Sequence, residues 1–274
     1  FTYLNIHMDM KINKNHLFLL LSVYLVLFSS CSDSLSDTTD GRLRYWISTL
    51  ASDEFEGRAP GTEGGKLTKN FISKTFQDLS LDPVNGEYLH KVPASEITLK
   101  DSSYLTLSFR GNDRKMITGQ EVVFWTKQAR EYRKIRDSEV VFVGYGIVAP
   151  EYNWNDYEGI DVRGKTVVIL VNDPGFATGK LRLFNGRSMT YYGRWTYKFE
   201  EAARQGAAAA IIVHEEEPAA YPWSVVENSW QGPQLDLQRE DLGADRAILE
   251  GWIRDITLDE VLNFTGFNYQ SLKE

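Results

Sequence analysis

Histidine is the side chain that most often acts as a general base or a metal ligand near neutral pH, and this chain has four. His7 and His16 lie in or before an apolar N-terminal segment, which leaves His90 and His214 as candidates. His214 ends the run AAAAIIV and precedes three glutamates. These side chains could form a metal or proton-transfer cluster, but consecutive side chains of a strand point to opposite faces. The pattern favours a strand end that runs into a solvated acidic loop closed by Pro218.

The common catalytic motifs are missing from the sequence. It contains no Gly-x-Ser-x-Gly elbow, no His-Glu-x-x-His pair and no Walker loop. Gly144 and Gly146 form a Gly-x-Gly, but no helix with a third glycine follows, so we expect a bend between strands in which Trp154 and Tyr157 pack. From side-chain chemistry alone we predict no catalytic residue and no metal ligand.

Composition describes a globular protein of 274 residues with 42% hydrophobic and 13% aromatic residues. This length fits one large domain or two smaller ones. The net charge of −8 argues against a nucleic-acid-binding surface, which would need clustered lysine and arginine. We therefore expect no nucleic-acid partner, and composition does not indicate an oligomeric state.

The N-terminal segment has the pattern of a bacterial lipoprotein signal. Lys11 and Lys14 precede the apolar run of residues 17–28, which is short for a membrane span and suits a signal peptide. Small residues before Cys31 resemble a lipobox, although Phe28 is unusual there. We predict a signal peptide at 1–31, lipidation of Cys31 and a flexible tether at 32–40. An ordinary signal peptide with an incidental cysteine, or a short membrane helix, is the alternative.

The lipid anchor implies a location in the cell envelope. The membrane would be a partner through that anchor, on the periplasmic side or at the outer-membrane surface.

Two helices are expected to open the globular region. An apolar face at helical spacing predicts the first helix, with Asp40 as its N-cap. A second stripe predicts another helix that ends before Pro83 and Gly86. The first stripe is Leu43, Trp46, Ile47 and Leu50, and the second is Leu67, Phe71, Ile72, Phe76 and Leu79.

The pattern changes to strands from about residue 97. Five β-rich runs at 104–109, 121–125, 138–148, 164–173 and 207–215 are bounded by turn residues or helices. Residues 192–206 read as an amphipathic helix packed by Tyr192, Trp195 and Phe199, although a binding face is also possible. Residues 247–253 are a further strand candidate, and Thr257 with Glu260 has the spacing of a capping box that begins a helix. The middle region therefore predicts a β-rich domain with one or more helices that ends near residue 245.

The turn between the two predicted helices is built from specific residues. Pro60 and Gly61 predict a sharp bend, and Thr62 is placed to cap the helix that begins near Glu63. Arg58 could hold the turn through an ion pair or reach toward a cleft, and the first role is favoured.

Two segments resemble a known family. LASDEFEGRAPGTEGGKLTKNFISKTFQDLSL, with Arg58, Gly61 and Thr62 in an Arg-x-x-Gly-Thr turn, resembles the N-terminal segment of zinc-dependent exopeptidases of the aminopeptidase Y and glutamate carboxypeptidase type. VFVGYGIVAPEYNWNDYEGIDVRGKTVVILVNDP and FEEAARQGAAAAIIVHE resemble a protease-associated domain inserted into such a peptidase.

The resemblance implies a domain organisation. Residues 41–96 would be the helical start of an incomplete α/β zinc-exopeptidase domain. Residues 97–245 would be the β-rich protease-associated insert, and residues 246–274 would return into the peptidase domain. We expect the chain to be an N-terminal fragment of a longer lipoprotein.

The resemblance also implies an activity. Members of the family hold two zinc ions that activate a water molecule, with a glutamate as general base, and the ligand set opens with His-x-Asp. Neither His90 nor His214 has Asp two residues later, so we expect both zinc ions to be held outside this chain and the fragment to be inactive. The substrate would be a peptide. The alternative is a lipid-anchored, non-catalytic binding protein on the same scaffold.

Overall fold

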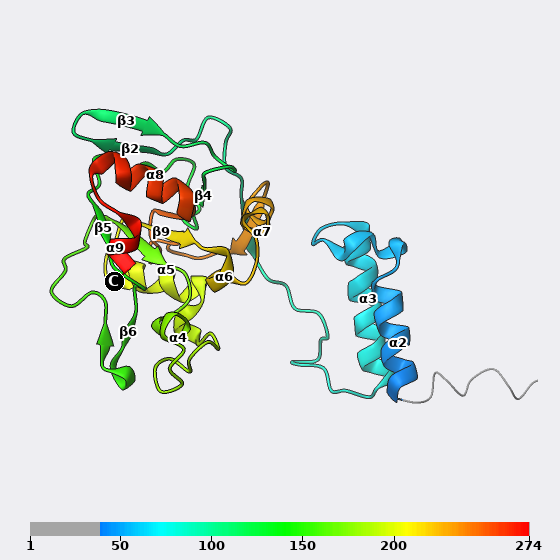
Figure 1. The fold of residues 1–274 in the computed structure, drawn as a ribbon. Helices are drawn as coiled ribbons and strands as arrows, with labels where there is room; N and C mark the ends of the chain where they lie inside the picture. The colour runs from blue at the N-terminus through cyan, green and yellow to red at the C-terminus, as the bar shows by residue number, and fades with distance from the viewer. Residues whose placement is uncertain (1–38, 274) are drawn as a thin grey trace, which may run out of the picture. The chain divides into compact units, whose positions relative to one another are not determined.

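The computed structural model describes residues 39–273, which form two compact units, residues 39–91 and 92–273 (Figure 1). The predicted signal peptide and Cys31 lie outside the described residues. Within the described range, every helix is too short or too polar to span a bilayer. Helices and a mixed sheet together give an α/β fold, as predicted.

The first unit is a pair of helices joined by a turn. It consists of α2 (Thr39–Leu50), the 3-10 helix η1 (Asp53–Arg58) and α3 (Glu63–Asp78). Asp40 lies within α2 and pairs with Arg44 at 2.8 Å, so it is not the predicted N-cap. The ring of Phe71 on α3 lies 6.0 Å from Phe55 of η1 and 6.1 Å from Tyr45 of α2. These aromatic contacts pack the two helices together. Tyr45 lies outside the predicted apolar face of α2, and Leu43 and Ile47 of that face are exposed.

The centre of the second unit is a five-stranded sheet. Its strand order is β4 (Val122–Trp125), β11 (Leu249–Arg254), β9 (Ala209–His214), β8 (Thr166–Leu170) and β5 (Val140–Phe142). β11, β9, β8 and β5 are parallel, and β4 pairs antiparallel with β11. The predicted buried runs at 164–173 and 207–215 are confirmed as β8 and β9, because strands covered on both faces are continuously apolar.

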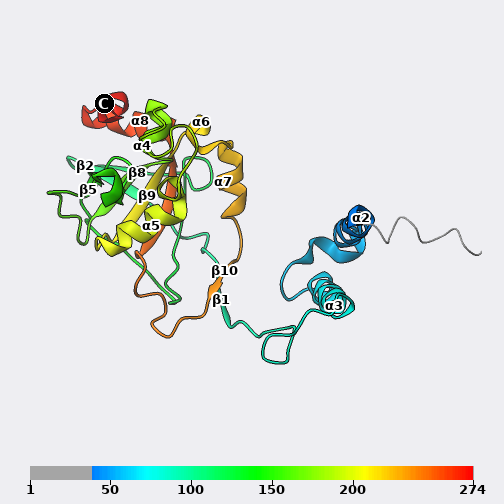
Figure 2. The ribbon, with the colours of Figure 1, turned by 90° about the horizontal axis from the view of Figure 1, so that it is seen from below.

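Helices cover both faces of this sheet (Figure 2). On one face, Phe199 of α5 (Trp195–Arg204) and Trp223 of α7 (Trp223–Ser229) pack against alternate strand residues. On the other, Val261 of α8 (Asp255–Thr265) packs against the remaining strand residues. The hairpin of β2 (Thr106–Phe109) and β3 (Asn112–Lys115) and the terminal helix α9 (Tyr269–Lys273) complete that layer.

Short elements connect these layers. β1 (Ala94–Ile97) pairs antiparallel with β10 (Gln234–Leu237), and β6 (Val148–Ala149) pairs antiparallel with β7 (Trp154–Asn155). The remaining elements are η2 (Pro150–Tyr152), α4 (Pro174–Thr178), η3 (Tyr191–Gly193) and α6 (Glu216–Ala219).

Three observations concern the ends of the second unit. The units divide after Lys91 rather than after residue 96. Of the residues that follow the predicted insert, Leu249–Arg254 form β11, which pairs with β4 and β9 inside the sheet. α8 begins at Asp255 directly after β11, so Thr257 lies inside the helix, and the predicted capping box was wrong.

Candidate functional site

The carboxyl ends of the parallel strands are the first place to look for a site, since open α/β sheets bind ligands there. α4, α6 and α8 follow β8, β9 and β11, and Figure 2 shows the three helices at the same end of the sheet. The polar residues that gather at this edge are Tyr145, Asp173, Lys198, His214 and Glu215. The chemistry open to them depends on the hydrogen bonds that they already make.

Asp173 is fully buried and lies three residues after the end of β8. One carboxylate oxygen accepts the Gly175 N–H at 3.1 Å and caps α4. The other accepts the backbone N–H of Thr190 at 2.9 Å and its hydroxyl at 2.7 Å. Asp173 therefore ties two loops together, and three donors already occupy its carboxylate.

Lys198 is fully buried in the first turn of α5. Its Nζ donates to the carbonyl oxygens of Tyr145 at 2.7 Å and Tyr192 at 2.9 Å. Burial lowers the pKa of Lys198 to about 7, and the carboxylates of Asp156 and Asp173 partly oppose this. Lys198 links the loop after β5 to η3 from inside the protein. The predicted aromatic face of this helix did not include it.

An ion pair and two tyrosines lie at the outer part of the carboxyl edge of the sheet. Lys273 of α9 pairs with Glu215, the residue that follows β9. Burial raises the pKa of Tyr145 to about 12, and Glu215 adds to the effect. Burial also raises the pKa of Tyr269, again with Glu215 contributing. Both phenols are neutral near pH 7, and Glu215 is neutralised by a lysine.

His214 ends β9, as predicted, and its side chain is only 2% exposed. Its ring centroid lies 5.5 Å from Tyr221, 5.6 Å from Trp223 and 6.0 Å from Trp252. Burial lowers the pKa of His214, and a backbone hydrogen bond with Tyr221 partly opposes this. Glu216 and Glu217 begin α6, where a loop was predicted, and Glu215 precedes this helix. The imidazole is packed among aromatic rings.

The zinc that the family resemblance implies does not fit the described residues. Within residues 39–273, no group of three or more His, Cys, Asp or Glu side chains could hold a metal ion. His214 is enclosed by aromatic rings, and His90 is exposed and lies in the other unit. A zinc site needs three or four converging donor atoms, so we assign no catalytic step to a metal in this part of the chain.

The Arg58–Thr62 turn is the other predicted feature. The Arg58 guanidinium donates to the carbonyl oxygen of Leu50 at the end of α2, which is a hydrogen bond and not the favoured ion pair. Gly61 has φ +83°, a conformation that glycine adopts without strain. The Thr62 hydroxyl accepts the Gly65 N–H at 3.1 Å and donates to Ala59 at 2.7 Å. The three residues fix the entry into α3.

Two glycines after this turn were missed by the sequence analysis. A Cβ at Gly64 would lie 2.0 Å from the carbonyl oxygen of Phe55, and one at Gly65 would lie 2.3 Å from that of Ala59. Both glycines therefore allow η1 and the turn to lie directly against the first turn of α3. The pair GlyGly at a helix start, where glycine is unfavourable, was the signal.

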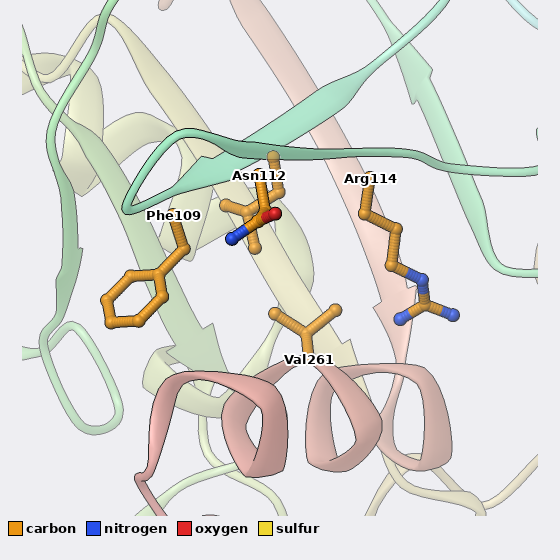
Figure 3. Close-up of a pocket in the computed structure, with 5 residues that line it drawn as sticks. Phe109, Asn112, Arg114 and Val261 are labelled. Carbon is orange, nitrogen blue, oxygen red and sulfur yellow. The ribbon is translucent and has the colours of Figure 1, made fainter.

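A small pocket lies between the β2–β3 hairpin and α8 (Figure 3). It is lined by Leu107, Phe109, Asn112, Arg114 and Val261 and has a volume of about 20 Å³. This volume holds one water molecule. Arg114 pairs with Glu121 at 2.6 Å and with Glu260 at 2.9 Å, so its charge is already compensated. The pocket is too small for a peptide side chain.

No protein-family profile and no curated protein sequence matches the chain. Four chains of solved structures are similar to this chain, among them two bacterial aminopeptidases. An aminopeptidase from Aneurinibacillus sp. strain AM-1 has 17% identity and a TM-score of 0.34, over 81% of this chain and 43% of that one. A zinc aminopeptidase from Bacillus subtilis has 17% identity and a TM-score of 0.27, over 74% of this chain and 42% of that one. The chain spans less than half the length of either enzyme, and likeness at this level carries no argument about function.

Proposed function

We propose that this chain belongs to a zinc-dependent exopeptidase that removes residues from one end of peptides in the bacterial cell envelope. The observation that carries the proposal is the turn at Arg58, Gly61 and Thr62. Its sequence has the family pattern, and its three residues are those that join η1 to α3. The second resembling segment supports it, because its two parts form β8 and the α5–β9 unit in family order.

The described residues have a non-catalytic role in this proposal. Asp173 and Lys198 bond to the protein's own backbone, Glu215 is paired with Lys273, and His214 is enclosed. These groups hold loops in place and are not free to act on a substrate. We therefore place the zinc ligands and the general base outside residues 39–273. Attachment to the membrane through Cys31 completes the proposal.

The test compares two proteins, the 274-residue chain and the product of the complete reading frame. Each is incubated with a mixture of short peptides, and the products are identified by mass spectrometry with zinc, with a chelator, and after zinc is restored. We expect the longer protein to release terminal residues only when zinc is present, and the 274-residue chain to release none.

Two outcomes contradict the proposal. Zinc-dependent hydrolysis by the 274-residue chain would place the active site inside it. Peptide binding without hydrolysis by the longer protein would favour the alternative, a lipid-anchored binding protein.

A further inference from the structure

The loop between β4 and β5 concentrates positive charge in an acidic protein. Residues 130–137, REYRKIRD, contain four basic and two acidic residues, whereas the whole chain has a net charge of −8. We define the basic loop as residues 130–137. The side chains of Arg130, Lys134 and Arg136 are exposed, and Arg133 is half-buried.

The basic side chains of the loop lack ion-pair partners among the described residues. None of its four basic side chains forms an ion pair within residues 39–273, whereas the neighbouring Lys127 lies 3.9 Å from Asp236. Arg133 Nε has no hydrogen-bond partner there. An anionic partner would supply the counter-charges that the protein itself does not provide.

Hydrogen bonds hold both ends of the basic loop, and its middle makes no backbone–backbone hydrogen bond with the described residues. Ala129 N–H donates to Leu242 at 2.9 Å, and the Ser138 hydroxyl donates to Gly164 at 3.3 Å. Between these anchors, residues 131–137 make no backbone–backbone hydrogen bond with any described residue and form neither helix nor strand. The segment therefore has no strand edge to which a peptide could add.

Its composition suits a membrane surface better than a peptide. Tyr132 is 71% exposed among the cations. Tyrosine is enriched where its ring lies at the level of lipid headgroups, and clustered Lys and Arg bind anionic lipids. We propose that the basic loop docks the second unit on an anionic lipid surface. The proposal rests on the proposed envelope location but does not require peptidase activity or lipidation of Cys31.

The test measures binding of the full 274-residue chain to vesicles by co-sedimentation. Every protein carries Cys31→Ser, so that no acyl chain contributes. Vesicles are pure phosphatidylcholine, or phosphatidylcholine with 30% phosphatidylglycerol. Because each basic residue near an anionic surface strengthens binding about fivefold, the triple variant Arg130→Gln, Lys134→Gln, Arg136→Gln should bind the anionic vesicles about 100-fold more weakly.

The control variant Arg42→Gln, Lys69→Gln, Arg182→Gln removes the same charges from exposed side chains that form no ion pair within the described residues. It should bind within about threefold of the parent, because these charges lie outside the basic loop. The charge-preserving variant Arg130→Lys, Arg136→Lys should bind like the parent, which assigns the loss to charge. A urea unfolding midpoint of the triple glutamine variant equal to that of the parent excludes misfolding as its cause.

Three results would overturn the proposal. The parent could bind both vesicle types equally, the two triple variants could lose affinity equally, or the chain could bind a glutamate hexapeptide but not the anionic vesicles. None of these results bears on peptide hydrolysis, so failure of this proposal and of the proposed enzyme are distinguishable.

Discussion

The buried Lys198 predicts a pH dependence of stability that one substitution removes. Its ordinary pKa is 10.5, and burial lowers the pKa to about 7 in the folded protein. The folded protein therefore releases the proton of Lys198 more easily than the unfolded chain does. The charged form opposes folding at and below pH 7, and this penalty decreases as the pH rises from 7 toward 10.5.

The magnitude follows from this shift. One pKa unit corresponds to 1.36 kcal/mol, so the whole effect is about 5 kcal/mol, of which about 2.5 kcal/mol is gained between pH 6 and pH 9. In Lys198→Met the side chain has similar length and no charge. The variant leaves the carbonyl oxygens of Tyr145 and Tyr192 without their donor, which costs about 1–3 kcal/mol each at every pH.

The assay is urea unfolding at pH 6, 7, 8 and 9, followed by fluorescence of the buried tryptophans. The unfolding free energy of the parent minus that of Lys198→Met should rise by about 2.5 kcal/mol from pH 6 to pH 9, because only the parent gains stability from deprotonation of Lys198. Titrations common to both proteins cancel in this difference. Lys180→Met, at an exposed lysine, is the matched control and should follow the parent at every pH. A difference that stays constant between pH 6 and pH 9 would refute the reasoning.

Three further substitutions test other parts of the fold. Glu250→Gln breaks a buried pair with Arg246 at 2.8 Å and should cost about 3–5 kcal/mol in urea unfolding, and a cost below about 1 kcal/mol would contradict this. Gly64→Ala should destabilise the first unit by about 1–3 kcal/mol, seen as faster hydrogen exchange in α3, because its Cβ would meet the Phe55 carbonyl. Asn70→Ala, at an exposed site of α3, should not accelerate exchange. Thr62→Ala should cost about 1 kcal/mol by removing the cap, whereas Thr62→Ser should retain it, and equal effects would argue against capping.

Local patterns predicted the elements whose signals are local. The stripe from Leu67 to Phe76 gave α3, and the apolar runs at β8 and β9 gave two central strands. These signals are periodicity and continuous hydrophobicity, which depend only on neighbouring residues.

The strand order and the buried polar contacts were not predicted, because they depend on residues that are far apart in the chain. The strand in residues 247–253 was predicted, but its place between β4 and β9 rests on pairing with residues about 130 and 40 positions away, respectively. Lys198 follows Trp195 by three positions and so shares its buried face, yet the carbonyls that hold it come from Tyr145 and Tyr192. The polar cluster at the carboxyl edge could not be assembled without the strand order.

The most direct test of the central claim uses the product of the complete reading frame and one peptide in four forms: with free ends, with an acetylated N-terminus, with an amidated C-terminus, and with both ends blocked. The account predicts stepwise, zinc-dependent release of single residues from the free peptide, abolished by blocking one end and not the other. Internal cleavage, hydrolysis that persists when both ends are blocked, or activity unaffected by a zinc chelator would contradict it.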